Sequence, residues 1–135
     1  MVGAPQKQAT LADFLAIPEE DRFHEIIDGE LVQKAQPTPR HGGAQVKLAA
    51  ALDPCEVDVL FSGAPLRPDL SGWRRERMPE LPATAFAQVT PDWVCEVLSS
   101  HRARDTVRKQ RIYRRHGVGH YWLLDSENET LTVLR

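Results

Sequence analysis

The segment FHEIIDGELVQ, residues 23–33, places the strongest local constraint on the fold of this 135-residue chain. Apolar runs flank Asp28 and Gly29, and an Asp-Gly pair between two such runs is the strongest short-range signal for a two-residue hairpin turn. The segment is therefore predicted to form a β-hairpin.

The remaining signals alternate between helix and strand. Helices are predicted at residues 10–17, 41–52 and 102–116, and strands at 56–61, 66–69, 93–98, 120–125 and 130–135. Thr10, with Asp13 three positions later, matches a capping box, and Gly117 stands where a helix C-terminus favours glycine. The order is helix, hairpin, helix, hairpin, strand, helix, hairpin. We therefore expect one domain over residues 1–135, with an α/β or α+β fold in which helices flank a mixed sheet.

Neither a membrane span nor a secretion signal is evident. The chain has no run of about 18 apolar residues, and its first residues lack the basic-then-apolar layout of a signal peptide. Cys55 and Cys95 lie among apolar residues, which favours small buried side chains in a reducing compartment over a disulfide. We expect a cytoplasmic protein that does not contact a membrane.

The net charge of −2 conceals a strong segregation of charge. Residues 10–31 contain seven acids and one base, whereas residues 101–116 contain seven Lys or Arg residues and one acid. Segregated positive charge indicates a polyanionic partner. A solvated helix face is the alternative interpretation of the basic segment.

Two carboxylates stand out because each closes or interrupts an apolar strand segment. Asp69 follows Pro68 at the end of one strand, and Glu96 lies inside WVCEVL. Carboxylates on neighbouring strands repel each other unless a divalent cation lies between them, and Mg²⁺ is commonly held by one or two carboxylates. Asp69 and Glu96 are therefore candidate Mg²⁺ ligands, with the backbone carbonyl of Val97 as a third. Alternatively, Asp69 caps a turn and Glu96 faces solvent or pairs with a helix arginine.

A positive group near such a metal could position water or stabilise charge on a reacting phosphate. Lys109 is the best candidate, because Asp105, Lys109 and Tyr113 are spaced four apart and share one helix face. The alternative is a surface Asp105–Lys109 pair, worth about 0.3–0.5 kcal/mol.

Pro68-Asp69, Glu96-Val97-Leu98 and the helix with Lys109 together resemble the PD-(D/E)xK phosphodiesterase superfamily. More narrowly, the sequence resembles a widespread bacterial family of restriction endonucleases. The resemblance covers nearly the whole chain through six segments in order: FHEIIDGELV, PTPRHGG, RPDLSGWRRERMP, DWVCEVLSS, RKQRIYRRHGV and HYWLLD. It implies a restriction-endonuclease-like fold and cleavage of phosphodiester bonds.

The resemblance also implies roles for individual residues. The lysine that the superfamily places in its E-x-K motif corresponds here to Leu98, and in this family a helix lysine is thought to replace it. By match to D-x-x-x-K-x-x-x-Y, that lysine is Lys109. Glu25 matches a further acidic position that approaches the site.

We therefore expect a DNA endonuclease that depends on Mg²⁺, with Mn²⁺ as a substitute, in which arginines bind the phosphate backbone. The arginines expected to contact DNA are Arg74, Arg75, Arg77, Arg104, Arg108 and Arg111. One alternative is a nuclease-derived module that binds nucleic acid or protein without cutting, which the abrupt connection from Leu52 to Cys55 favours. Another is a structural subunit of a homo-oligomer such as a homodimer, with the arginines at the interface.

Overall fold

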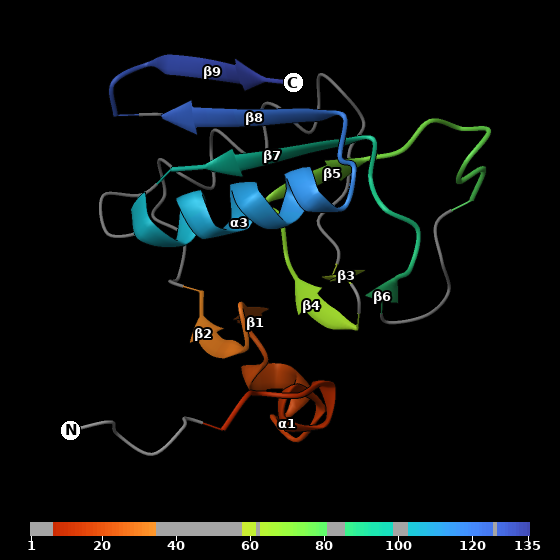
Figure 1. Ribbon diagram of the computed structural model, residues 1–135, viewed down its shortest axis with the longest axis vertical. Helices are drawn as coiled ribbons and strands as arrows, with labels where there is room; N and C mark the ends of the chain where they lie inside the picture. Colours follow the sequence, from red (N-terminus) through yellow and green to blue (C-terminus); the bar gives the residue numbers. More distant parts are fainter. Residues whose placement is uncertain (1–6, 35–57, 62, 81–85, 99–102, 126) are drawn as a thin grey trace.

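The computed structural model describes residues 7–34, 58–61, 63–80, 86–98, 103–125 and 127–135, and side chains are described within these ranges except at 103–105 (Figure 1). The helix expected over residues 41–52, the connection from Leu52 to Cys55 and the basic residue Arg102 lie outside the described residues.

Two α-helices, one short 3-10 helix and nine strands are described. In chain order they are α1 (Leu11–Leu15), η1 (Glu19–Asp21), β1 (His24–Ile27), β2 (Glu30–Gln33), β3 (Asp58–Phe61), β4 (Ala64–Leu66), β5 (Leu70–Gly72), β6 (Phe86–Ala87), β7 (Trp93–Val97), α3 (Ala103–Arg115), β8 (His120–Asp125) and β9 (Thr130–Leu134). Within the described ranges, no helix is both long and apolar enough to cross a bilayer.

The N-terminal region follows the sequence signals closely. The Thr10 side chain accepts from the Asp13 amide while the Asp13 carboxylate accepts from the Thr10 amide, so the predicted capping box begins α1. Asp28 and Gly29 both have positive φ, 49° and 79°, which the tight turn between β1 and β2 requires. This two-residue turn pairs Ile27 with Glu30 and fixes the register of the whole hairpin.

The other strands form two sheets, one of order β5-β7-β8-β9 and one of order β4-β3-β6 (Figure 1). In the larger sheet, β7 pairs parallel with β8, and α3 is the crossover between them. The expected strand over residues 66–69 is wrong in one respect. β4 ends at Leu66 and β5 begins at Leu70, so Asp69 lies where the chain passes from one sheet to the other. Pro68, which lacks an amide proton, disfavours a continuous strand there.

Helix α3 packs one face against the sheets and so brings its inward side chains into the centre of the protein (Figure 1). Lys109, Ile112 and Tyr113 recur at helical spacing and are all buried. The helix ends at Arg115, and Gly117 follows it with a φ of +80° and an amide that donates to the carbonyl of Arg114, which fits the glycine predicted after the helix C-terminus. The core cluster consists of Ile27, Val59, Phe61, Leu66, Ala87, Val94, Ile112, Tyr113 and Tyr121.

Candidate active site

Three buried carboxylates gather where the hairpin, the β4–β5 connection and β7 meet. Glu25 comes from β1, Asp69 from the connection and Glu96 from β7, and their exposed fractions are only 1%, 4% and 7%. A buried carboxylate is costly unless cations or hydrogen-bond donors surround it. The identity of those partners therefore defines the chemistry of the site.

Lys109 reaches the carboxylates from α3. Its Nζ donates to Glu25 Oε1 at 2.8 Å and forms an ion pair with Glu96 Oε1. Burial alone would lower the pKa of Lys109, but the negative charges of Glu25 and Glu96 outweigh burial and raise it, so the group stays cationic. Because Lys109 is only 4% exposed, it is not the surface partner of Asp105 that the alternative interpretation required.

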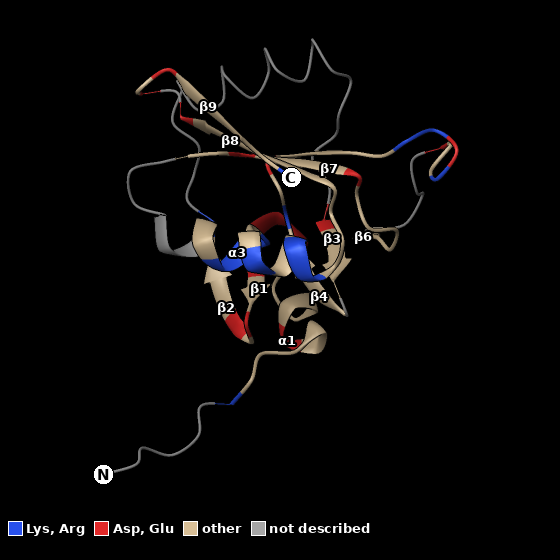
Figure 2. Ribbon diagram, turned by 45° about the horizontal axis from the view of Figure 1, so that its top comes forward, with Lys and Arg blue, Asp and Glu red and all other residues tan. Residues whose placement is uncertain are grey.

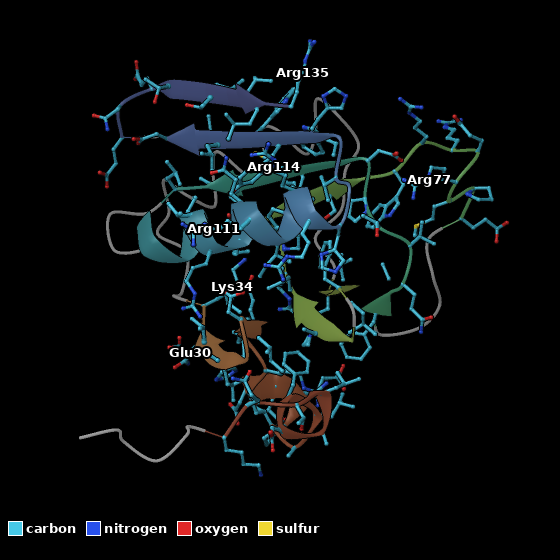
Figure 3. All side chains as sticks on the ribbon, in the orientation of Figure 1. Glu30, Lys34, Arg77, Arg111, Arg114 and Arg135 are labelled. Atoms are coloured by element: carbon cyan, nitrogen blue, oxygen red, sulfur yellow. The ribbon has the colours of Figure 1, made fainter. Side chains whose placement is uncertain are left out.

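Lys34, which follows β2, supplies a second cation. Its Nζ donates to Asp69 Oδ1 at 3.0 Å and to the carbonyl oxygen of Arg67 at 2.8 Å, and it lies 3.9 Å from Glu25 Oε1. Figure 3 labels this side chain between the hairpin and α3. Lys34 therefore links the Asp69 carboxylate to the carboxylates that surround Lys109.

The five groups form a carboxylate–lysine chain in which charges alternate, in the order Asp69, Lys34, Glu25, Lys109 and Glu96. When all are ionised, the three carboxylates exceed the two ammonium groups by one negative charge. Burial, together with the negative charge of Asp69, raises the pKa of Glu96 to about 7 against the opposing effect of Lys109. The carboxylate–lysine chain therefore has more negative than positive groups, and Glu96 is a carboxylate in it whose pKa is raised.

Hydrogen bonds from uncharged groups orient two of the carboxylates. The amide of Val97 donates to Asp69 Oδ2 at 2.7 Å, and the Tyr113 hydroxyl donates to Glu96 Oε1 at 2.7 Å. Val97 thus contacts the predicted metal ligand Asp69 through its amide, and the proposed use of its carbonyl stays a prediction. Tyr113 lies one turn after Lys109, so both groups on this helix face bond to Glu96, as their spacing of four residues allows.

A further ion pair, between Arg67 and Asp58, stabilises the backbone of the site. Arg67 donates from two nitrogens to the two carboxylate oxygens of Asp58, at 2.8 and 2.9 Å. The Arg67 amide also donates to Glu25 Oε1 at 3.1 Å, and its carbonyl accepts from Lys34. Such a two-point contact fixes a guanidinium in one orientation. The contact with Asp58 therefore keeps the Arg67 backbone in the position from which its amide and carbonyl contact Glu25 and Lys34.

The helix arginines divide into two kinds. Arg108 donates to Glu30 at 2.9 Å, to Asp28 at 3.4 Å and to the carbonyl of Ile27 at 2.7 Å, and so ties α3 to the hairpin turn. Arg111 is exposed on α3, where Figure 3 labels it. The side chain of Arg104 lies outside the described residues. Among the three helix arginines expected to contact DNA, Arg111 is therefore the one with a described, exposed side chain.

The loop arginines lie away from the carboxylates. Arg77 pairs with Asp92 at 2.7 Å, and the amide of Arg74 donates to the same carboxylate. Asp92 directly precedes β7, whereas Glu96 lies near the other end of that strand, four residues or about 13 Å farther along at ordinary strand spacing. Figure 2 shows this basic loop, which includes the exposed Arg75, projecting beyond the sheet and apart from α3. The structure therefore does not bring these arginines to Asp69.

The carboxylates fit the donor set of a hard divalent cation. In the described ranges, no three His, Cys, Asp or Glu side chains form a group that could hold a metal by themselves, and lysine ammonium groups bond to the carboxylates. Mg²⁺ needs only one or two carboxylates and keeps several waters. Asp69 and Glu96, in a chain of groups with one excess negative charge, match that requirement.

Lys34 was missed from the sequence, although a signal for it exists. The turn fixes Glu25 opposite Val32 in the hairpin. Residues two apart in a strand face the same side, so Lys34 is the diagonal neighbour of Glu25. A hairpin register deduced from Asp28-Gly29 could have placed a lysine beside Glu25, and only the position of Asp69 required the three-dimensional structure.

Comparisons with known proteins agree with this fold. The family model for Uma2, described as "Putative restriction endonuclease", matches residues 11–135. The crystal structure of a putative nuclease belonging to DUF820 from Anabaena variabilis ATCC 29413 is similar, with a TM-score of 0.76 and 27% identity over 94% of this chain and 79% of that one. No curated protein matches the chain. The restriction-endonuclease-like fold and the family description together support a nuclease function, and the chain belongs to the Uma2 family.

Proposed function

We propose that this protein is a Mg²⁺-dependent endonuclease that hydrolyses phosphodiester bonds in DNA, with Mn²⁺ able to replace Mg²⁺. The observation that carries the proposal is the carboxylate–lysine chain, which buries three carboxylates beside two lysines and leaves one negative charge in excess. One divalent cation and one phosphodiester together add a single positive charge. This added positive charge would offset the excess negative charge of the carboxylates.

Asp69 and Glu96 would hold the metal, with the Val97 carbonyl as a further ligand. A bound Mg²⁺ supplies Lewis-acid polarisation of the phosphate and lowers the pKa of water. The protein's part is to orient these carboxylates, through the Val97 amide on Asp69 and the Tyr113 hydroxyl on Glu96. Fixed ligands matter because phosphoryl transfer depends on accurate positioning of the reacting groups.

Lys109 would hold the attacking water or stabilise negative charge as it develops on the phosphate. Its raised pKa keeps it positive, so it acts by charge and by hydrogen-bond donation and not as a general base. Glu25 holds Lys109 at 2.8 Å and is therefore a positioning residue. This arrangement supports the replacement of a strand lysine at Leu98 by a helix lysine.

DNA contacts are proposed chiefly for the exposed face of α3. Arg111 is exposed there, and Arg104 lies two turns earlier on the same helix. Phosphate contacts of this kind supply affinity without sequence preference. Arg108 could add to them only by leaving its acidic partners, and Arg74, Arg75 and Arg77 would contact DNA at a separate place beyond the opposite end of β7.

The test is nicking of a supercoiled plasmid with Mg²⁺ or Mn²⁺. Asp69→Asn and Glu96→Gln should each abolish nicking and keep the folded circular dichroism spectrum. Matched controls are Asp92→Asn, which changes a carboxylate at the other end of β7, and Glu30→Gln, which changes an exposed one. Both controls should nick like the wild type. Full nicking by either site variant would refute the two-carboxylate site.

A second candidate function is a module that binds nucleic acid and does not cut. The observation that favours it is that Lys34 and Lys109 already bond to the carboxylates that would hold the metal. In this case the plasmid stays intact with either metal while DNA still binds. The same plasmid, followed by a gel-shift measurement, therefore separates the two functions.

A further inference from the structure

Lys34 and Lys109 differ in how firmly the structure holds them. Lys109 lies on the core-facing side of α3 with 5% of its side chain exposed, between Glu25 and Glu96. The Lys34 side chain is 15% exposed and follows the last residue of β2. A lysine ammonium is a strongly hydrated charge on a flexible stem with several rotatable bonds. Lys34 is therefore the cation that can turn towards solvent with less disruption.

The surroundings of the Lys34 ammonium consist of oxygen atoms of the kinds that bind hard cations. Nζ lies 2.8 Å from the carbonyl oxygen of Arg67, 3.0 Å from Asp69 Oδ1 and 3.9 Å from Glu25 Oε1. Carboxylate and backbone carbonyl oxygens are ordinary ligands of Mg²⁺ and Ca²⁺. Two hydrogen bonds from the Arg67 side chain to Asp58 restrain the residue that supplies this carbonyl. Lys34 thus occupies a built cation position.

We propose that Lys34 is a resident counter-ion of the metal site, which neutralises Asp69 in the metal-free protein and leaves when a divalent cation binds there. This rests on the proposed function, because it requires that Asp69 be a metal ligand. The exchange is electrostatic. The Lys34 ammonium and a divalent cation compete for the same Asp69 carboxylate, and the two cations repel each other when both are close to it. Lys34 therefore weakens metal binding and stabilises the metal-free fold.

The test is isothermal titration of Mn²⁺ into Lys34→Met and the wild type. Removal of the competing ammonium should tighten Mn²⁺ binding by about tenfold to a hundredfold. Lys34→Gln, which keeps a hydrogen-bond donor and loses the charge, should bind Mn²⁺ more tightly as well, and Lys34→Arg should bind it as weakly as the wild type. The matched control is Lys7→Met, because Lys7 is an exposed lysine beside the hairpin turn. Lys7→Met should leave Mn²⁺ affinity unchanged.

A second measurement uses the wild type alone and so does not depend on a folded variant. Amine labelling read by mass spectrometry should show that saturating Mg²⁺ raises the reactivity of Lys34 several-fold, while the reactivity of Lys7 stays constant. Unchanged or lower reactivity of Lys34 with bound Mg²⁺ would overturn the inference. Equal or weaker Mn²⁺ binding by both neutral variants would also overturn it.

The two proposals fail in different ways. If the wild type binds neither Mn²⁺ nor Mg²⁺ and nicks no plasmid, and Lys34→Met also binds no metal, the proposed function is wrong and the inference falls with it. If the wild type binds metal through Asp69, as shown by loss of binding in Asp69→Asn, but Lys34 variants show no gain, only the counter-ion role is wrong.

Discussion

Replacement of Lys109 by methionine tests whether the buried ion pairs hold the centre of this fold together. Lys109→Met keeps the length of the side chain and removes the charge. It leaves Glu25 and Glu96 buried, with exposed fractions of 1% and 7%, and without their shared cation. Removal of one partner from a buried ion pair typically costs about 3–5 kcal/mol. For a chain of this size, that corresponds to a fall in Tm of about 10–20 °C.

The assay is urea unfolding followed by circular dichroism, with Arg111→Met as the matched control. Arg111 is exposed on the same helix, so its loss should change the free energy of unfolding by no more than about 0.5 kcal/mol. The double variant Glu25→Gln with Lys109→Met should lose less unfolding free energy than the sum of the two single variants, by at least about 1 kcal/mol. The reason is that it no longer leaves a charged Glu25 buried without Lys109.

The same reasoning fixes the sign of the pH dependence. Burial already raises the pKa of Glu96 and Lys109 opposes that rise, so without Lys109 Glu96 should take up a proton more readily as the pH falls, and its unpaired charge disappears. The difference in unfolding free energy between the wild type and Lys109→Met should therefore shrink between about pH 8 and about pH 5. The buried ion-pair interpretation would be refuted if Lys109→Met lost no more unfolding free energy than Arg111→Met. It would also be refuted if the difference in unfolding free energy between Lys109→Met and the wild type grew at low pH.

Three further predictions concern the neighbourhood of the site. Tyr113→Phe should lower the free energy of unfolding in urea by about 1.5–3 kcal/mol, because the Tyr113 hydroxyl bonds to the Glu96 carboxylate. An unchanged free energy of unfolding would show that this bond does not contribute to stability. Gly117→Ala should cost about 1–2 kcal/mol by the same assay, since φ is +80° there, and an unchanged midpoint would contradict that backbone conformation. Arg111 and Arg114 are both exposed on α3, so Arg111→Ala and Arg114→Ala should each lower the slope of log affinity for DNA against log salt by about 1. A slope that both variants leave unaltered would place the DNA elsewhere.

Local signals in the sequence determined much of this fold. The Asp28-Gly29 turn fixed the hairpin register, and Thr10 with Asp13 fixed the start of the first helix. These succeed because a two-residue turn or a helix cap is decided by residues within a few positions of one another. The spacing of Lys109 and Tyr113 likewise placed both on one face of α3, which is the face that packs inward.

The assembly of the site was decided by tertiary structure. The bond between Lys109 and Glu25 joins residues 84 positions apart, and that between the Val97 amide and Asp69 joins residues 28 apart. Such contacts depend on how the chain passes between the two sheets, which no local pattern encodes. The sequence resemblance could name Asp69, Glu96, Lys109 and Glu25 as members of one site. It could not show their partners. A buried carboxylate is costly unless a cation or a hydrogen-bond donor pairs with it, and the cation that pairs with Asp69 here is Lys34.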